Sequence, residues 1–127
     1  MPRRVLIFDD DEDILAICSH AIASFGWEVH TRSSCDNIFT TLESVKPSVI
    51  FMDNYIHKLS GIAATQMIKS HINYKNIPVI LFSANSEIRD LANNAGADTY
   101  LEKPFAIKDL ERVINSVLAI QMTNQTF

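Results

Sequence analysis

Carboxylate, hydroxyl and ammonium side chains follow four of the short apolar runs in this chain. The residues are Asp9, Asp10, Asp53, Ser83 and Lys103. Aspartate is depleted in β-strands and is rarely buried without a partner. Asp53, which directly follows the run VIFM, is therefore either a turn or cap residue or a side chain that a strand delivers to a site.

Acidic side chains at neighbouring positions need a counter-charge. Two like charges about 4 Å apart repel by about 4 kcal/mol at an effective dielectric constant of 20. A hard divalent cation removes this repulsion, and a small set of oxygen ligands is typical of Mg²⁺. We predict Asp9 and Asp10 as Mg²⁺ ligands, whereas residues 11–13 are expected to form the first turn of a helix, where acids favour the helix dipole.

A carboxylate beside Mg²⁺, a lysine and a hydroxyl group is an arrangement suited to phosphoryl transfer. An aspartate can act as the nucleophile and become an aspartyl phosphate. The cation and the lysine would then offset charge on the phosphoryl oxygens, so that the protein contributes mainly positioning.

Five apolar runs alternate with five amphipathic patterns along the chain. This alternation predicts a parallel sheet with helices on both faces. We expect a flavodoxin-like, doubly wound α/β fold with strand order 2-1-3-4-5, whose ligands bind at the carboxyl ends of strands 1 and 3. Strands 1, 3, 4 and 5 are neighbours in this order, so the polar side chains should converge. The predicted strands are 5–8, 27–31, 49–52, 79–82 and 99–101, and the predicted helices are 14–25, 38–45, 61–70, 88–95 and 107–118.

Length and composition are those of a single soluble domain. The chain has 127 residues, of which 47% are hydrophobic and 20% are charged, and its formal net charge is −4. Scattered basic residues and a negative net charge argue against direct binding of nucleic acid or of anionic membrane. No segment has the length of a signal-peptide core or a membrane span. We expect a cytoplasmic protein in which Cys18 and Cys35, both in helical patterns, are reduced thiols of the core. The predicted domain covers residues 1–121, and a polar tail covers residues 122–127.

Four motifs resemble the receiver domain of two-component response regulators. They are VLIFDDDEDI, VIFMDNYIHKLSGI, VILFSA and GADTYLEKPF, in order from Val5 to Leu118. The resemblance implies that Asp53 accepts a phosphoryl group from a phosphohistidine of a sensor histidine kinase or a histidine phosphotransfer protein. It further implies that Asp9, Asp10 and Asp53 bind Mg²⁺ together with the backbone carbonyl of Tyr55.

The same resemblance assigns the switch. Ser83 matches the hydroxyl residue that moves toward the phosphate, Tyr100 the aromatic residue that then moves inward, and Lys103 the lysine of the site. The Lys103–Pro104 bond matches a cis peptide. Phosphorylation would alter a surface of helix 4, strand 5 and helix 5 that an unidentified downstream partner reads, and it could promote a dimer.

Some positions depart from the family pattern. His57 stands where proline is common, and Ser60 where aspartate is common. Tyr55 and Asn85 occupy positions that tune autodephosphorylation, and we predict slow phosphate loss because Tyr55 screens the acyl phosphate from water.

Two alternatives stay open at this point. The first is an atypical receiver that acts as a protein-interaction module without phosphate. The second is a phosphatase of the haloacid dehalogenase type with Asp9 as nucleophile, although no strand with an acidic motif follows the lysine. In the leading interpretation the chain is not an enzyme and catalyses only its own phosphorylation and dephosphorylation, either as a stand-alone protein or as part of a longer one.

Overall fold

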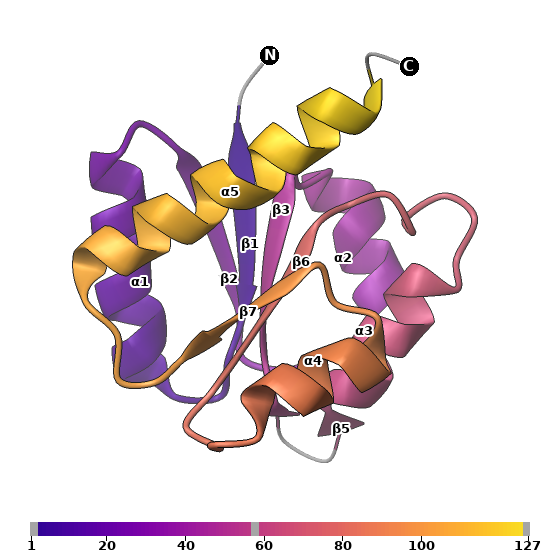
Figure 1. Ribbon diagram of the computed structural model, residues 1–127, viewed down its shortest axis with the longest axis horizontal. Helices are drawn as coiled ribbons and strands as arrows, with labels where there is room; N and C mark the ends of the chain where they lie inside the picture. Colours follow the sequence, from indigo (N-terminus) through magenta and orange to yellow (C-terminus); the bar gives the residue numbers. More distant parts are fainter. Residues whose placement is uncertain (1–2, 57–58, 126–127) are drawn as a thin grey trace.

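A central parallel sheet orders the fold in the computed structural model, which describes residues 3–56 and 59–125. The sheet order is β2-β1-β3-β6-β7 (Figure 1), so the five main strands follow the predicted order 2-1-3-4-5. A two-stranded antiparallel hairpin of β4 (Tyr55–Ile56) and β5 (Leu59–Ser60) was not predicted. The sheet strands are β1 (Arg4–Phe8), β2 (Glu28–Arg32), β3 (Val49–Asp53), β6 (Val79–Ser83) and β7 (Thr99–Glu102).

The central strands are buried on both faces, which explains their unbroken apolar runs. Successive side chains point to opposite faces of the sheet. Val5 and Ile7 pack with helices α1 (Glu12–Ser24) and α5 (Ile107–Gln125). Leu6 and Phe8 pack in the cluster of the opposite face, which α2 (Ile38–Val45), α3 (Gly61–Lys69) and α4 (Ile88–Ala95) cover. Full burial of each such side chain contributes about 1.5–3 kcal/mol.

Side-chain caps begin the two helices that flank the strand tips. The Asp11 carboxylate accepts hydrogen bonds from the backbone N–H groups of Asp13 and Ile14, and Glu12 and Asp13 occupy the first turn of α1. The prediction for residues 11–13 is confirmed. The Ser60 hydroxyl accepts from the N–H of Ala63 at 3.0 Å, so the serine at this departing position caps α3 as an aspartate would.

Helix α5 continues to Gln125, so the described part of the predicted polar tail, residues 122–125, is helical. No glycine or proline interrupts residues 119–125, and Ala, Gln and Met favour helix. The domain limit at 121 stays a prediction. Cys18 lies in α1 as predicted, but Cys35 precedes α2 and contacts the Met52 sulfur at 3.9 Å instead of lying in a helix. Both thiols are free and buried, and burial raises their pKa values to about 11 and about 12, respectively.

None of the helices within the described ranges has the length and apolar character needed to cross a membrane.

Candidate functional site

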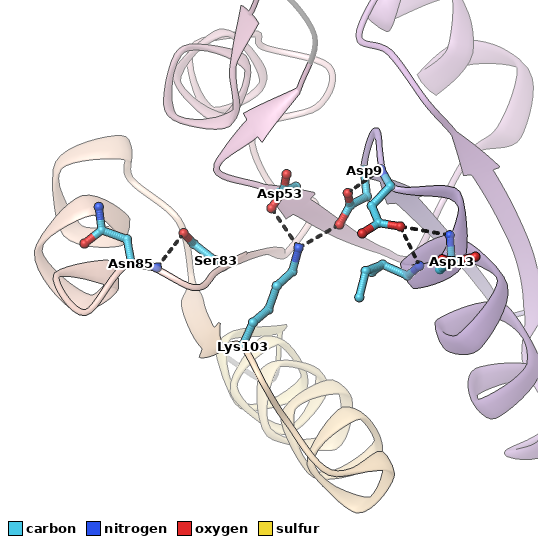
Figure 2. A network of polar contacts seen from close by, with 8 residues as sticks. Asp9, Asp13, Asp53, Ser83, Asn85 and Lys103 are labelled. Atoms are coloured by element: carbon cyan, nitrogen blue, oxygen red, sulfur yellow. Dashed lines mark hydrogen bonds and ion pairs between the residues drawn. The ribbon is translucent and has the colours of Figure 1, made fainter.

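The carboxyl ends of four strands bring the predicted polar residues to one edge of the sheet. Asp9 follows β1, Asp53 ends β3, Ser83 ends β6 and Lys103 follows β7. Figure 2 shows the Lys103 side chain reaching toward the carboxylates of Asp9 and Asp53, with Ser83 further along the same edge. The convergence expected from the strand order is present.

Lys103 connects the two aspartates. Its Nζ lies 2.9 Å from Asp9 Oδ2 and 3.1 Å from Asp53 Oδ1 (Figure 2). Asp9 is 1% exposed, and its Oδ1 accepts from the N–H of Asp11 at 2.9 Å. Both carboxylate oxygens of Asp9 therefore have partners inside the protein, whereas Asp53 uses only Oδ1 for Lys103.

Backbone and aromatic contacts fix the position of Lys103. Its N–H donates to the Ser83 carbonyl at 2.9 Å, and the Lys103–Pro104 bond is cis, as predicted. The ammonium lies 4.7 Å from the centre of the Phe82 ring, close enough for a cation–π interaction. The lysine is thus held at the site by β6 as well as by its ion pairs.

Negative charge exceeds positive charge at this edge. Asp9, Asp10 and Asp53 each offer a carboxylate oxygen, and these atoms lie within 4.8 Å of one another. Burial and the charge of Asp9 raise the pKa of Asp53, although Lys103 opposes the shift. Burial by itself would lower the pKa of Lys103, but its bonds to Asp9 and Asp53 outweigh this effect and raise it. Three hard oxygen donors with surplus negative charge fit Mg²⁺.

The backbone around Asp53 leaves no space for a side chain at position 61. The Asn54 N–H donates to the Phe82 carbonyl at 3.1 Å, and the Gly61 N–H donates to the Asn54 carbonyl at 2.6 Å. A Cβ atom on Gly61 would lie 1.8 Å from the Asp53 carbonyl oxygen. The β4–β5 hairpin returns the chain to this point. This role of Gly61 was not predicted, because its only signal in the sequence is a glycine at the expected start of a helix.

Within the described residues, neither of the predicted switch residues, Ser83 and Tyr100, is bonded to an acid of the site. The Ser83 side chain is 7% exposed, and its Oγ accepts from the Asn85 N–H at 3.0 Å (Figure 2). Tyr100 on β7 is 39% exposed, and Tyr55 on β4 is 67% exposed. His57 lies outside the described residues.

Comparison with known proteins places most of the chain in one family. Residues 5–115 match the family model of the response regulator receiver domain. The chain is 31% identical over 91% of its length to the transcriptional regulatory protein PrrA of Mycobacterium leprae, of which it covers 49%. It spans about half the length, or less, of the curated relatives it matches.

Solved structures share the architecture. The receiver domain of NtrX from Brucella abortus has a TM-score of 0.82 at 26% identity, over 91% of this chain and 98% of that one. A CheY-like receiver domain protein of Methanospirillum hungatei has a TM-score of 0.86 at 24% identity, over 98% of this chain and 99% of that one. The fold of the chain is that of these structures.

Proposed function

Because this chain belongs to the family of response regulator receiver domains, we propose that it accepts a phosphoryl group on Asp53 from a histidine kinase or a histidine phosphotransfer protein. The observation that carries the proposal is the Lys103 ammonium held between Asp9 and Asp53, beside a cluster of three carboxylates. A receiver domain is generally not an enzyme in the ordinary sense, since it turns over only its own acyl phosphate.

In the proposed reaction, an Asp53 carboxylate oxygen attacks the phosphorus atom. The new bond is the oxygen–phosphorus bond of an acyl phosphate, and the bond from phosphorus to the donor's imidazole nitrogen breaks. Asp53 must be ionised to attack, and the ammonium of Lys103 favours that form while also being placed to bind a phosphoryl oxygen. Asp9, Asp10 and Asp53 would hold Mg²⁺ with the Tyr55 carbonyl, and the cation would offset the negative charge of the phosphoryl group.

The burial of Asp9 argues against the phosphatase alternative. A nucleophile must reach its substrate, but Asp9 is 1% exposed and both of its oxygens already accept hydrogen bonds. Asp53 is the more accessible carboxylate, at 13% exposure of its side chain against 1% for Asp9. This difference supports Asp53 as the acceptor.

Incubation with acetyl phosphate and Mg²⁺ is expected to add one phosphoryl group to the intact mass of the protein. Asp53→Ala removes the acceptor oxygen, so this variant should show no gain, whereas Asp13→Asn on the first turn of α1 should be modified like the wild type. A mass gain that persists in Asp53→Ala would contradict the proposal. No gain in the folded wild type would favour the phosphate-independent module.

Mg²⁺ is expected to stabilise the domain through the acid cluster. At ten times the dissociation constant the gain is about 1.4 kcal/mol, which raises the melting temperature by roughly 5 °C. Thermal unfolding with MgCl₂, against NaCl of equal ionic strength, measures it. Asp10→Asn should weaken the response, whereas Asp13→Asn, which removes the same charge outside the cluster, should retain it. Equal responses in both variants would place the ion elsewhere.

Tyr55 is expected to slow hydrolysis of the acyl phosphate. Tyr55 is 67% exposed on β4, two residues after the proposed acceptor, so its ring can shield that side of the site from water. Tyr55→Asn should shorten the lifetime of the phosphorylated form several-fold, followed by mass after removal of acetyl phosphate. An unchanged lifetime would contradict this role. We assign Asn85, on the loop after β6, to the same tuning.

The output of the switch would lie on α4, β7 and α5. Phosphorylation would draw the Ser83 hydroxyl from the Asn85 N–H toward the phosphate and allow Tyr100 to move inward. A groove of about 580 Å³ between β7 and α5, lined by residues that include Tyr100, Glu102 and Arg112, supports this surface as the one that a partner reads. The related PrrA is named a transcriptional regulatory protein, and a link of this chain to transcription is part of the proposal only.

A further inference from the structure

Strand β2 lies at the edge of the sheet with one side open. Among the residues that the structure describes, the order β2-β1-β3-β6-β7 gives β2 a single strand neighbour. The Glu28 N–H donates to the Arg3 carbonyl at 2.9 Å, and the Arg32 carbonyl accepts from the Asp9 N–H at 3.2 Å. Alternate residues of a parallel strand bond to the same neighbour. The backbone groups of Val29 and Thr31 therefore face the open edge.

A cationic groove runs beside this edge. It has a volume of about 560 Å³ between β2 and the carboxyl end of α2, and its charged lining residues are Arg4, Glu28, His30, Arg32 and Lys46. Glu28, the one acid among them, already accepts from Arg4 at 3.0 Å and from His30 at 2.7 Å. In a chain of net charge −4, this is a local surplus of positive charge. An acidic ligand is the complementary one.

An arginine of the groove covers the edge itself. The Arg32 guanidinium donates from Nη1 to the carbonyl of Thr31 at 2.8 Å. That carbonyl is one of the groups that face away from β1, so a side chain satisfies it where a further strand would. If an N–H of an added strand donated to the Thr31 carbonyl instead, the Arg32 guanidinium would be free to pair with a carboxylate of that strand.

The side chains on the two faces of β2 indicate which side chains an added strand would need on each face. Val29 packs against the apolar cluster of α1 and α5, on the face opposite the groove. Thr31 shares the face of Val29, whereas His30 and Arg32 line the groove. Side chains of an added strand alternate in register with those of its neighbour. Alternate residues would therefore meet cations on one face and a β-branched, largely apolar surface on the other.

We propose that the open edge of β2 binds an extended peptide segment in which acidic residues alternate with apolar residues. The segment adds to the sheet as a sixth parallel or antiparallel strand. Main-chain hydrogen bonds to Val29 and Thr31 hold it, and its carboxylates pair with Arg32 and Lys46. This site lies at the edge of the sheet opposite β7 and is separate from the proposed output surface.

The test uses the whole chain and two peptides of equal composition. One is acetyl-Glu-Val-Glu-Val-Glu-amide, which matches the five residues of β2, and the other is acetyl-Glu-Glu-Glu-Val-Val-amide. Each peptide is titrated into the protein at low salt, and backbone amide NMR follows the binding. The alternating peptide should shift the amide signals of Val29 and Thr31. Its dissociation constant should be lower than that of the non-alternating peptide by roughly fivefold or more. Equal affinity for both peptides, or no binding at about 1 mM, would overturn the proposal. An oligothymidylate that displaced the bound alternating peptide as well as free alternating peptide does would also overturn the proposal, because it would indicate a surface that binds any polyanion.

Peptide N-methylation tests the strand geometry without altering the protein. Only alternate amides of an added strand face β2. Methylation of the two valine amides and methylation of the glutamate amides should therefore have opposite effects, one abolishing binding and the other leaving it unchanged. Which set is sensitive also reports the direction of the strand. Tolerance of both sets would show that no strand forms and would overturn the proposal.

Two pairs of substitutions, one inside the groove and one outside it, test whether the cations of the groove bind the peptide. Arg32→Gln combined with Lys46→Asn should weaken binding roughly tenfold. Asparagine tolerates the positive φ of 53° at position 46, so the end of α2 is retained. The control combines Lys75→Asn with Arg89→Gln, two exposed cations outside the groove, and should bind like the wild type. A similar loss in both pairs would indicate attraction by net charge alone and would contradict the assignment.

Discussion

Gly61→Ala is expected to destabilise the domain by roughly 3 kcal/mol, the upper part of the range for inserting a group into a filled site. The new Cβ would lie 1.8 Å from the Asp53 carbonyl oxygen and 2.7 Å from its carbonyl carbon. Those atoms belong to backbone that is also held by the bonds from Asn54 to Phe82 and from Gly61 to Asn54, so it cannot yield as a flexible side chain would. Denaturant unfolding measures the loss.

The same substitution should slow phosphorylation of the molecules that remain folded, because relief of the overlap must shift the backbone of Asp53, the proposed acceptor. The control is Gly26→Ala. Position 26 has a φ of +93° and open space around its Cβ, so alanine there is strained by conformation only, by about 1–2 kcal/mol. Gly26→Ala should therefore lose stability but keep the phosphorylation rate of the folded protein. Normal phosphorylation in Gly61→Ala would show that the acceptor position is not sensitive to this contact.

Lys103→Met is expected to lower the rate of phosphorylation by acetyl phosphate by about 10²–10³-fold, the usual effect of removing one group that stabilises transition-state charge. Methionine keeps an unbranched side chain of similar volume, one heavy atom shorter, so the variant tests the charge more than the volume. Lys108→Met, an exposed lysine in the first turn of α5, is the matched control and should react at the wild-type rate. Equal rates in the two variants would contradict the role of Lys103.

Loss of this lysine should also alter stability in a pH-dependent way. Asp9 and Asp53 would keep their burial without a counter-charge, which costs about 3 kcal/mol when Mg²⁺ is absent. Burial and the charge of Asp9 already raise the pKa of Asp53, and removal of the cation would raise it further. An acid whose pKa is higher in the folded state destabilises the fold when ionised, so the deficit should be greatest at neutral pH and should shrink as the pH falls through the folded-state pKa. A deficit that is constant across this range would contradict an electrostatic origin.

The sheet and the acids at its strand ends were predictable from local patterns. Unbroken runs such as residues 49–52 indicated strands buried on both faces, and the carboxylates of Asp9 and Asp53 stood directly at the strand ends. Apolar residues at helical spacing predicted a helix over 88–95, the residues where the structure has α4. These features depend on residues a few positions apart, which is the range over which side-chain periodicity acts.

The contacts that set the geometry of the site were decided by tertiary structure. Lys103 meets Asp53 and Asp9 across 50 and 94 residues, respectively. The approach of Gly61 to the Asp53 carbonyl depends on the β4–β5 hairpin, and the Ser83 hydroxyl is bonded to the Asn85 N–H and not to an acid. The sequence by itself determined the five strands of the main sheet, the five helices and the polar residues that end the strands, because burial acts on each short segment. Distances, bond partners and the excess of negative charge were decided only when the parallel sheet brought separate strand ends together, because a parallel sheet joins residues that are far apart in the chain.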